Sequence, residues 1–488
     1  MTACHHAGEG SRRRRPQGSG YGAVVPARPG TLPGPSPVDA SGTPSRADVV
    51  VVGAGLAGLA CARELMGSGL DVVVLEADDG VGGRVRTDCV DGVLVDRGFQ
   101  LLNPTYPALP WFVDVDALHL QALGAGVVVA RGASPTVRTT LADPLRRPDA
   151  VAGILRSGLL TPGDVLGLLR LVARAALLPV GRLEQAPDTG WHAAFDAAGL
   201  IGPLRHHVVE PFLTGTLADA DGTTSRRYVD LLLRSFATAG LLGSPGLPVG
   251  GMQAFSDAVA APLPSGSVRT RARVQSLAAT GDAWTVHGDH PGGDFQVLAG
   301  TVVLAGESQA SAALLGRPAP VDRALTTVWH LSDERLPVGR RGRYLHVDGD
   351  GSHARRHGLV NTVVVNRSAP SYLPAHLQGH RDLVATTVLG TFGDERAAAL
   401  GAIRTQVARV LGTDPVALGE EIAVHEIPRA LPRREPPLHV RRPVGLDDGR
   451  FVVGDHRDTP SIQGALVSGR RGAHAVLDHL GLVPSSAR

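Results

Sequence analysis

Apolar residues near the start of the chain form two short runs separated by a helical stretch. Four consecutive valines, Val49–Val52, predict a buried strand, and Val72–Leu75 predicts a second strand that ends on Glu76. The sequence between the two runs, to about Ser68, is helical in character. Two short buried strands joined by a helix are typical of a βαβ unit with parallel strands.

The turn between the first strand and the helix contains glycines spaced as GxGxxG. Gly53 permits a tight turn, Gly55 leaves room for a diphosphate beside the backbone, and Gly58 lets the helix lie close to the sheet. The helix N-terminus would then direct free N–H groups and a partial positive charge at the diphosphate. Glu76 can accept hydrogen bonds from ribose hydroxyls, and its charge disfavours a 2′-phosphate. The unit therefore predicts FAD or NAD in preference to NADP.

The segment that follows Glu76 distinguishes between these two cofactors. Gly82 and Gly83 leave the backbone open beside the diphosphate, and Arg84 offers it a planar fork of N–H donors. With this segment, the chain resembles the superfamily of FAD-dependent amine oxidases, phytoene desaturases and protoporphyrinogen oxidases. The resemblance implies an α/β flavoprotein oxidoreductase with a Rossmann-like FAD-binding domain and an interleaved α+β substrate domain. It also implies that Arg84 lies near the pyrophosphate.

The resemblance implies further contacts with FAD from distant parts of the chain. It places Gly98–Gln100 near the isoalloxazine and the backbone of Val274 near the adenine. It places Gly454-Asp455 at the ribityl phosphate, and it directs the helix that starts near Ser461 at the pyrimidine edge, where its positive end would stabilise a reduced, anionic flavin. The residues predicted to bind FAD are Gly53, Ala54, Gly55, Ala57, Gly58, Glu76, Ala77, Gly83, Arg84, Gly98, Phe99, Gln100, Val274, Gly454, Asp455, Ser461, Ile462 and Gln463.

The remaining signals divide the chain into alternating segments of two domains. Helices are predicted from about Trp191 to Phe236, and strands at Val268–Leu277, Leu325–Leu331, Leu359–Asn366 and Leu383–Leu389, before a helix from about Glu395 to Leu411. The predicted organisation is a disordered tail rich in Arg, Gly and Pro (1–46) and an FAD-binding domain in three segments (47–103, 248–315 and 444–488). The substrate domain is predicted in two segments, a helical cap (104–247) and a strand-rich segment (316–443).

Composition narrows the classes of partner. A net charge of +2 argues against a large nucleic-acid surface, and no apolar stretch is long enough to span a membrane. No secretory apolar region follows the arginine run of the tail, so we expect a cytoplasmic protein. The leucine-rich helix around 164–178 packs in the core or, as the alternative, lies on a membrane surface.

The sequence offers no metal site. His206, His207 and Glu210 have no partner pair at zinc spacing, and we predict no metal site. The oligomeric state stays open.

The sequence identifies no catalytic residue, but the absence of lysine from the chain bears on the reaction. All 48 basic residues are arginines, whereas many amine oxidases of the resembled superfamily place a lysine near flavin N5. The absence favours hydride removal from a C–H bond of a small apolar or polycyclic substrate. An amine oxidase without the lysine, a redox-neutral flavin isomerase or mutase, and a flavin-binding protein without turnover are the alternatives. Some amine oxidases of the resembled superfamily link the flavin to a C-terminal cysteine, but no cysteine follows Asp455 in this chain. The resemblance therefore implies FAD bound without a covalent link.

Overall fold

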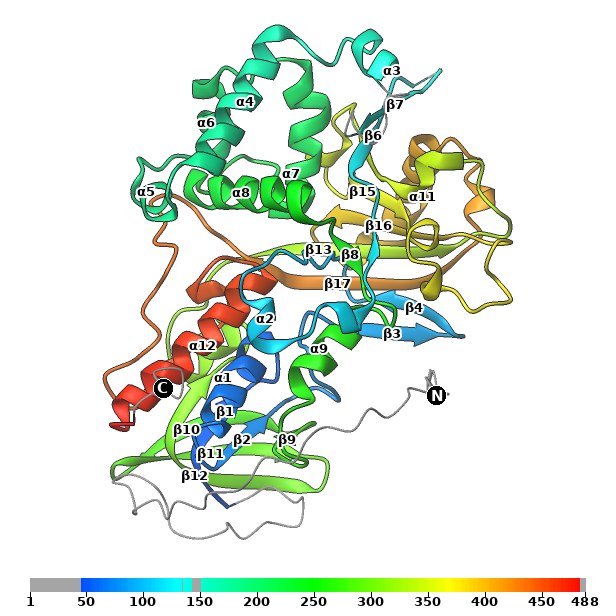
Figure 1. Cartoon of the computed structure of the whole chain (residues 1–488). Coiled ribbons are helices and arrows are strands. Elements are labelled where there is room, and N and C mark those ends of the chain that lie inside the picture. Colours follow the sequence, from blue (N-terminus) through cyan, green and yellow to red (C-terminus); the bar gives the residue numbers. More distant parts are fainter. Residues whose placement is uncertain (1–44, 134, 143–150, 483–488) are drawn as a thin grey trace, which may run out of the picture.

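The computed structural model describes residues 45–133, 135–142 and 151–482, and its described part is built around two seven-stranded sheets. In Figure 1, one sheet lies at the bottom of the view beside helices α1 (Leu56–Met66) and α12 (Ile462–His479). The second sheet crosses the middle of the view, and a group of helices lies above it (Figure 1). The predicted α/β class, with a Rossmann-like domain interleaved with a second domain, is confirmed.

The first sheet contains the predicted βαβ unit. Strand β1 pairs in parallel with β2 on one side and with β12 on the other, and β18 from near the C-terminus pairs in parallel with β12. The sheet therefore joins strands that are far apart in the sequence. Its elements and adjacent helices are β1 (Arg46–Val52), α1 (Leu56–Met66), β2 (Val72–Leu75), α9 (Met252–Ala260), β9 (Val268–Arg269), β10 (Arg273–Thr280), β11 (Ala283–His290), β12 (Gly293–Leu304), α10 (Ser308–Leu314), β18 (Arg450–Val452) and α12 (Ile462–His479).

Both faces of this sheet are apolar. Successive residues of a strand point to opposite faces. Val49 and Val51 belong to the core that includes α1 and α12, whereas Val50 belongs to the core formed with β11 and β12. Helices α1 and α12 approach closely because residue 469 is glycine, since a Cβ there would lie 2.2 Å from the Ala57 carbonyl oxygen. Burial on both faces explains the unbroken valine run of β1.

The second sheet has the strand order β17-β13-β16-β15-β14-β6-β7. One face of this sheet packs on α11 (Arg396–Leu411). The opposite face packs at one end on the domain that contains the first sheet, and at its other end on the helices of residues 151–242, called the upper helices below. Between the domains lie a hairpin, β3 (Thr87–Val90) and β4 (Val93–Asp96), the short helix α2 (Leu109–Phe112), and the short pair β5 (Gln121–Ala122) and β8 (Gly246–Leu247). The elements of the second sheet are β6 (Gly126–Arg131), β7 (Val137–Ala142), β13 (Asp322–Leu331), β14 (Leu345–Asp348), β15 (Leu359–Val364), β16 (Leu383–Leu389), α11 (Arg396–Leu411) and β17 (Glu420–Pro432).

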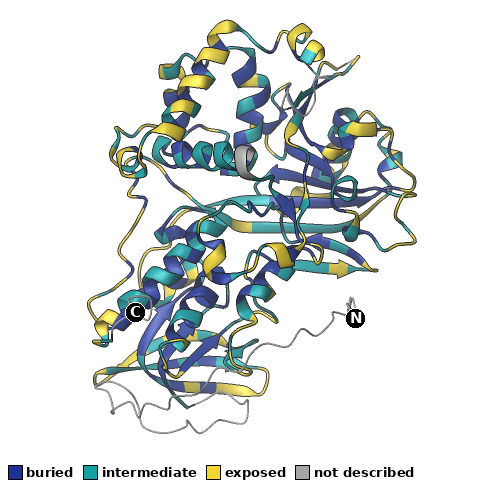
Figure 2. Ribbon diagram, in the orientation of Figure 1, coloured by how far each residue is buried: buried dark blue, intermediate teal, exposed yellow. Residues whose placement is uncertain are grey.

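The upper helices cover the end of the second sheet near β6 and β14. Helix α4 (Pro162–Leu177) buries Gly167, Leu171 and Ala175, as predicted for a core-facing helix, but it leaves Leu169 and Leu177 exposed. Figure 2 shows exposed stretches, in yellow, along this group of helices. Among the described residues, no helix has both the length and the apolar character needed to cross a membrane. The helices of this group are α3 (Val151–Arg156), α4 (Pro162–Leu177), α5 (Val180–Gln185), α6 (Trp191–Ala198), a π-helical turn (Arg205–Val209), α7 (Glu210–Leu217) and α8 (Arg226–Leu242).

The structure differs from the sequence prediction in several local features. Segment 104–247 contains β6 and β7 as well as helices, and these strands were not predicted. The predicted strand Val268–Leu277 is interrupted at Arg271, which has a φ of 57° and whose N–H donates to the Asp78 carbonyl oxygen. Of the predicted tail, residues 1–44 lie outside the described residues, and Arg46 already belongs to β1.

The carboxylate of Asp96, at the end of β4, joins the two domains. It accepts hydrogen bonds from the Tyr372 hydroxyl at 2.7 Å, the Thr87 hydroxyl at 2.5 Å and the Met252 N–H at 3.1 Å. Its backbone carbonyl accepts from Trp329 Nε1 at 3.2 Å. Asp96 is 1% exposed, and burial raises its pKa to about 6 even though these donors act in the opposite direction.

We predict that Asp96 makes stability depend on pH. A carboxyl with a raised pKa stabilises the fold while it is protonated, so its contribution is present below about pH 4 and is lost as the pH rises through 6. Compared with Asp96→Asn, the wild type should lose up to about 3 kcal/mol between pH 4 and 7.5. The melting temperatures of both proteins across this range measure the difference. Parallel profiles would contradict the prediction, and Tyr372→Phe, which removes one donor, should steepen the wild-type profile.

Candidate functional site

The predicted glycine turn lies at the carboxyl end of β1. Gly53 has a φ of 107°, which suits glycine, and its N–H donates to the Leu75 carbonyl oxygen at 2.8 Å. A Cβ on Gly58 would lie 2.0 Å from the Gly53 carbonyl oxygen, so this glycine is needed for packing. A Cβ on Gly55 would have no heavy atom within 4 Å. The middle glycine therefore borders open space, as expected where a ligand passes the backbone, and Ala57 is buried in the first turn of α1.

Glu76 and Ala77 directly follow β2, beside the glycine turn. Glu76 Oε2 accepts from the Ala54 N–H at 2.6 Å, and Oε1 accepts from the Asp78 N–H at 2.8 Å. The Glu76 carbonyl oxygen accepts from the Ala272 N–H at 2.8 Å, two residues before Val274 on β10. The turn therefore holds the Glu76 carboxylate in place, and the backbone of Glu76 contacts the chain two residues before Val274.

Arg84 and Asp455 meet although they come from opposite ends of the chain. Gly83 has a φ of 60°, and a Cβ on it would lie 3.3 Å from Gly55 Cα, so this segment runs beside the glycine turn. Arg84 forms an ion pair with Asp455 at 2.8 Å and donates to the Ala430 carbonyl oxygen at 2.6 Å. Burial of Asp455 acts to raise its pKa, but Arg84 outweighs it and lowers the pKa below its usual range. Asp455 is therefore held as a carboxylate.

The segment predicted to lie at the isoalloxazine is next to Arg84. Gly98 has a φ of 95°, and a Cβ on it would lie 2.9 Å from Ile427 Cδ1. The Phe99 N–H donates to Thr327 Oγ1 at 3.3 Å, which brings this segment against β13 of the second sheet. Gln100 Nε2 donates to the Arg84 carbonyl oxygen at 3.1 Å. Gln100 Oε1 is buried and has no hydrogen-bond partner among the described residues.

The predicted C-terminal motif surrounds the start of α12. The Gly454 N–H donates to Ser468 Oγ at 3.0 Å, and Ser461 caps the helix by accepting from the Gly464 N–H at 3.0 Å. Gln463 Oε1 accepts from the Ala108 N–H at 2.9 Å, so this side chain fixes a neighbouring loop. The first N–H groups of the helix, including those of Ile462 and Gln463, have no acceptor within the helix and are available to an anionic group.

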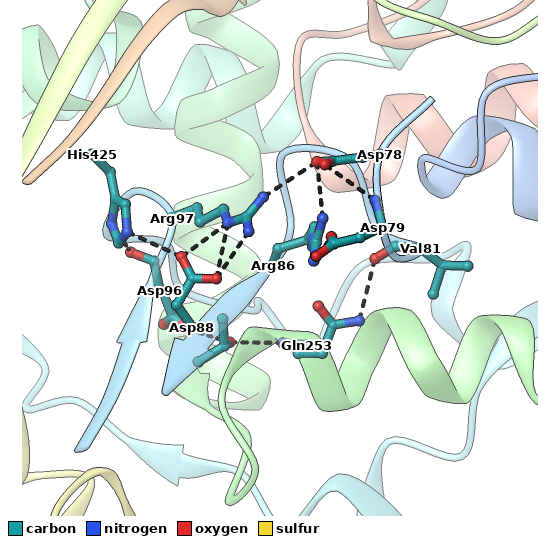
Figure 3. A network of polar contacts seen from close by, with 10 residues as sticks. Asp78, Asp79, Val81, Arg86, Asp88, Asp96, Arg97, Gln253 and His425 are labelled. Atoms are coloured by element: carbon teal, nitrogen blue, oxygen red, sulfur yellow. Dashed lines mark hydrogen bonds and ion pairs between the residues drawn. The ribbon is translucent and has the colours of Figure 1, made fainter. Parts of the chain in front are cut away.

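A polar network that the sequence analysis did not identify supports these segments (Figure 3). Arg86 forms ion pairs with Asp78 and Asp79 at 2.9 and 2.7 Å, and Arg97 forms ion pairs with Asp78 and Asp88. The network orients the backbone on either side of the β3–β4 hairpin. Only the Asp and Arg residues on either side of the GGR segment signal it in the sequence.

His425 of β17 joins this network from the second sheet (Figure 3). Its Nδ1 lies 3.1 Å from the Asp96 carbonyl oxygen, and its Nε2 lies 3.1 Å from Asp88 Oδ2. Burial lowers the pKa of His425 although Asp88 acts in the opposite direction. His206 and Glu210 lie in the helical group instead, where Glu210 pairs with Arg205 at 2.6 Å and with His206 at 3.0 Å.

These features fit a flavin dinucleotide. Gly55 borders open space, and Arg84 supplies a cation where a diphosphate needs one. Gln100 Oε1 and His456 Nε2 are buried without hydrogen-bond partners among the described residues, so a bound molecule could satisfy them. Burial lowers the pKa of His456 to about 4, so its ring is neutral at pH 7.

Solved structures with the same fold extend over nearly the whole chain. Putrescine oxidase bound to putrescine matches with a TM-score of 0.64 and 20% identity, over 89% of this chain and 99% of that protein. Cyclohexylamine oxidase from Brevibacterium oxydans matches with a TM-score of 0.58 and 16% identity, over 89% and 100%. A fatty acid isomerase from P. acnes matches with a TM-score of 0.58 and 13% identity, over 87% and 97%. At these identities the likeness shows the fold alone.

Sequence comparisons identify the family. Putrescine oxidase of Kocuria rosea is 51% identical over 67 residues, which are 14% of each chain. The flavin-containing amine oxidase B of Cavia porcellus is 55% identical over 62 residues, which are 12% of each chain. The chain therefore aligns with only a small part of these relatives. The model of the flavin-containing amine oxidoreductase family matches residues 56–333, more than half of the chain. The chain thus belongs to the flavin-containing amine oxidoreductase family.

Proposed function

We propose that this protein binds FAD without a covalent link and removes hydride from a C–H bond of a small, largely apolar substrate. The observation that supports this most directly is the meeting of three distant segments. Gly83 lies beside the glycine turn, Arg84 pairs with Asp455, and Gln100 donates to the Arg84 carbonyl oxygen. The space beside Gly55 holds no protein atom. Each segment offers the type of group that one part of FAD requires.

The roles we assign to the chain's own residues are binding and orientation. Glu76 would accept hydrogen bonds from the ribose, and Arg84 together with the start of α12 would neutralise the charge of the diphosphate and of the reduced flavin. Gly98 and Phe99 would hold the ring next to β13, where Thr327 Oγ1 accepts a hydrogen bond from the Phe99 N–H. When bound, the flavin supplies the hydride acceptor.

The proposal of an apolar substrate is supported by the second sheet. The face of the sheet turned toward Gly98 includes Trp329, Val363, Leu383 and Ala385, all buried. Such a face favours contact with hydrocarbon over contact with a charged group.

Non-covalent attachment is supported by the cysteine positions. No cysteine follows Cys89, so the C-terminal motif offers no sulfur to a flavin. Cys61 is fully buried on α1, where burial raises the pKa of its thiol and leaves it unreactive.

Two alternatives follow from the neighbours. The first alternative is an amine substrate, which the putrescine and cyclohexylamine oxidases among the structural neighbours favour. The second is isomerisation, because a fatty acid isomerase has the same fold. An isomerase causes no net oxidation of its substrate, whereas an amine oxidase and a dehydrogenase of apolar molecules both do. The class of substrate then distinguishes the amine oxidase from the dehydrogenase.

We predict that Gly55→Ala separates cofactor binding from folding. Gly55 has φ and ψ of −70° and 174°, which alanine adopts, and its Cβ would meet no atom of the protein. The apoprotein should therefore keep its melting temperature, while FAD binds about 10- to 100-fold more weakly because the methyl group fills the space proposed for the diphosphate. FAD titration of both apoproteins measures this.

Gly58→Ala is the matched control, because its Cβ would lie 2.0 Å from a backbone oxygen. It should lower the melting temperature of the apoprotein itself, by an amount that corresponds to about 1–3 kcal/mol. Unchanged FAD affinity in Gly55→Ala would show that the diphosphate lies elsewhere.

A second prediction concerns the reaction itself. The purified protein should show a flavin spectrum, and heating should release FAD into the supernatant because no covalent bond retains it. Under anaerobic conditions, a substrate should bleach the flavin absorption, and oxygen or another acceptor should restore it. A screen that compares apolar cyclic compounds with primary amines then assigns the substrate class. Conversion of a substrate without bleaching would favour the isomerase, and a colourless protein that FAD cannot reconstitute would contradict the proposal.

A further inference from the structure

A row of polar side chains crosses the otherwise apolar face of the second sheet. The register pairs His425 with Thr327, Thr327 with Thr387, and Thr387 with Asn361, on the neighbouring strands β17, β13, β16 and β15. Residues paired directly across strands project from the same face of a sheet. The row therefore faces one side along its whole length.

Two contacts show which side this is. Thr327 accepts a hydrogen bond from the Phe99 N–H, and His425 contacts the Asp96 carbonyl oxygen. The row thus begins at the segment that we propose to lie at the isoalloxazine, and it continues away from that segment through Thr387 to Asn361. The adjacent Thr362 and Thr386 bond to each other at 2.9 Å on the opposite face.

Asn361 ends the row with an unused hydrogen-bonding group. It is 8% exposed, and its Oδ1 is buried without a hydrogen-bond partner among the described residues. A buried acceptor left unsatisfied costs about 1–3 kcal/mol, so a structure rarely retains one without a reason. A β-bulge between Leu359 and Asn361 changes the pairing at this point, and such bulges redirect side chains.

Helix α7 covers Asn361 from the side of the upper helices. A Cβ on Gly215 would lie 2.5 Å from Asn361 Nδ2, so the helix can approach the amide only because residue 215 has no side chain. Phe212, one turn earlier, packs against both the first core and the helical core but is only partly buried. The amide therefore lies between α7 and the sheet, at the boundary of the two cores.

We propose that Asn361 accepts a hydrogen bond from the substrate and so selects molecules that have an apolar body and one neutral N–H or O–H group. The inference rests on the proposed function, because Phe99 and Thr327 connect the row to the proposed flavin position. The row contains no carboxylate, so it has no charge with which to select a permanently cationic group. The substrate class is thus a small alcohol or uncharged amine with a hydrocarbon body.

The test compares ligands that differ in one group, bound to the holoprotein and detected by their effect on the flavin absorption spectrum. Benzyl alcohol and toluene share a ring, and only the alcohol has an O–H donor. We expect wild type to bind benzyl alcohol about tenfold more tightly than toluene, as one additional hydrogen bond to a buried acceptor allows. Asn361→Leu should abolish this preference and leave toluene binding unchanged.

Two further variants separate recognition from folding. Asn361→Asp should shift the preference to benzylammonium at pH 7, because a carboxylate replaces the amide. Thr362→Val is the matched control, since it alters the next residue of the same strand on the opposite face. It should lower the melting temperature but keep the preference.

Failure of this inference differs from failure of the proposed function. No preference in wild type, or a preference that Asn361→Leu retains, overturns the role of Asn361. If the same protein binds FAD and is reduced anaerobically by a substrate, the proposed function still holds. A protein without FAD, or one whose flavin no substrate reduces, overturns the function instead.

Discussion

The buried carboxylate of Asp96 is the constraint on which the arrangement of the two domains depends. An ionised carboxylate in an apolar interior is expensive unless donors surround it. Thr87 and Met252 supply donors from the first domain, and Tyr372 supplies one from the second. Separating the domains would remove the Tyr372 hydroxyl from this group. The cost of an unsatisfied carboxylate therefore opposes any shift of the second sheet relative to Gly98.

The ion pair of Arg84 and Asp455 has the corresponding effect within the first domain. It connects residues that are hundreds of positions apart, and it does so beside the glycine turn. Both partners are held charged, because each lowers the cost of burying the other. A dinucleotide spanning these segments meets a site in which the cationic and anionic groups already have fixed positions, which reduces the ordering cost of binding.

The sequence predicted the features that depend on local spacing. The valine run, the glycine turn and the position of Glu76 follow from residues within one βαβ unit, and the start of α12 follows from Ser461. The polar row was beyond sequence reasoning, since Thr327, Thr387 and Asn361 become neighbours only through the register of three strands. Strand β6 was missed for a similar reason. It pairs in parallel with β14, which lies more than two hundred residues later.

The two domains use different kinds of polar group, and this division bears on the missing lysine. Charged residues such as Arg84, Asp455 and Glu76 gather where the anionic cofactor is proposed to bind. Over the proposed flavin position, the second sheet presents hydroxyl and amide groups among apolar ones. Because the two sets lie on different sheets, substitutions on the second sheet can change the substrate while the cofactor site stays intact. The chain has no lysine, so no ammonium group stands in this row, and Asn361, whose Oδ1 bonds to no described residue, is the position where we expect a change of residue to alter recognition.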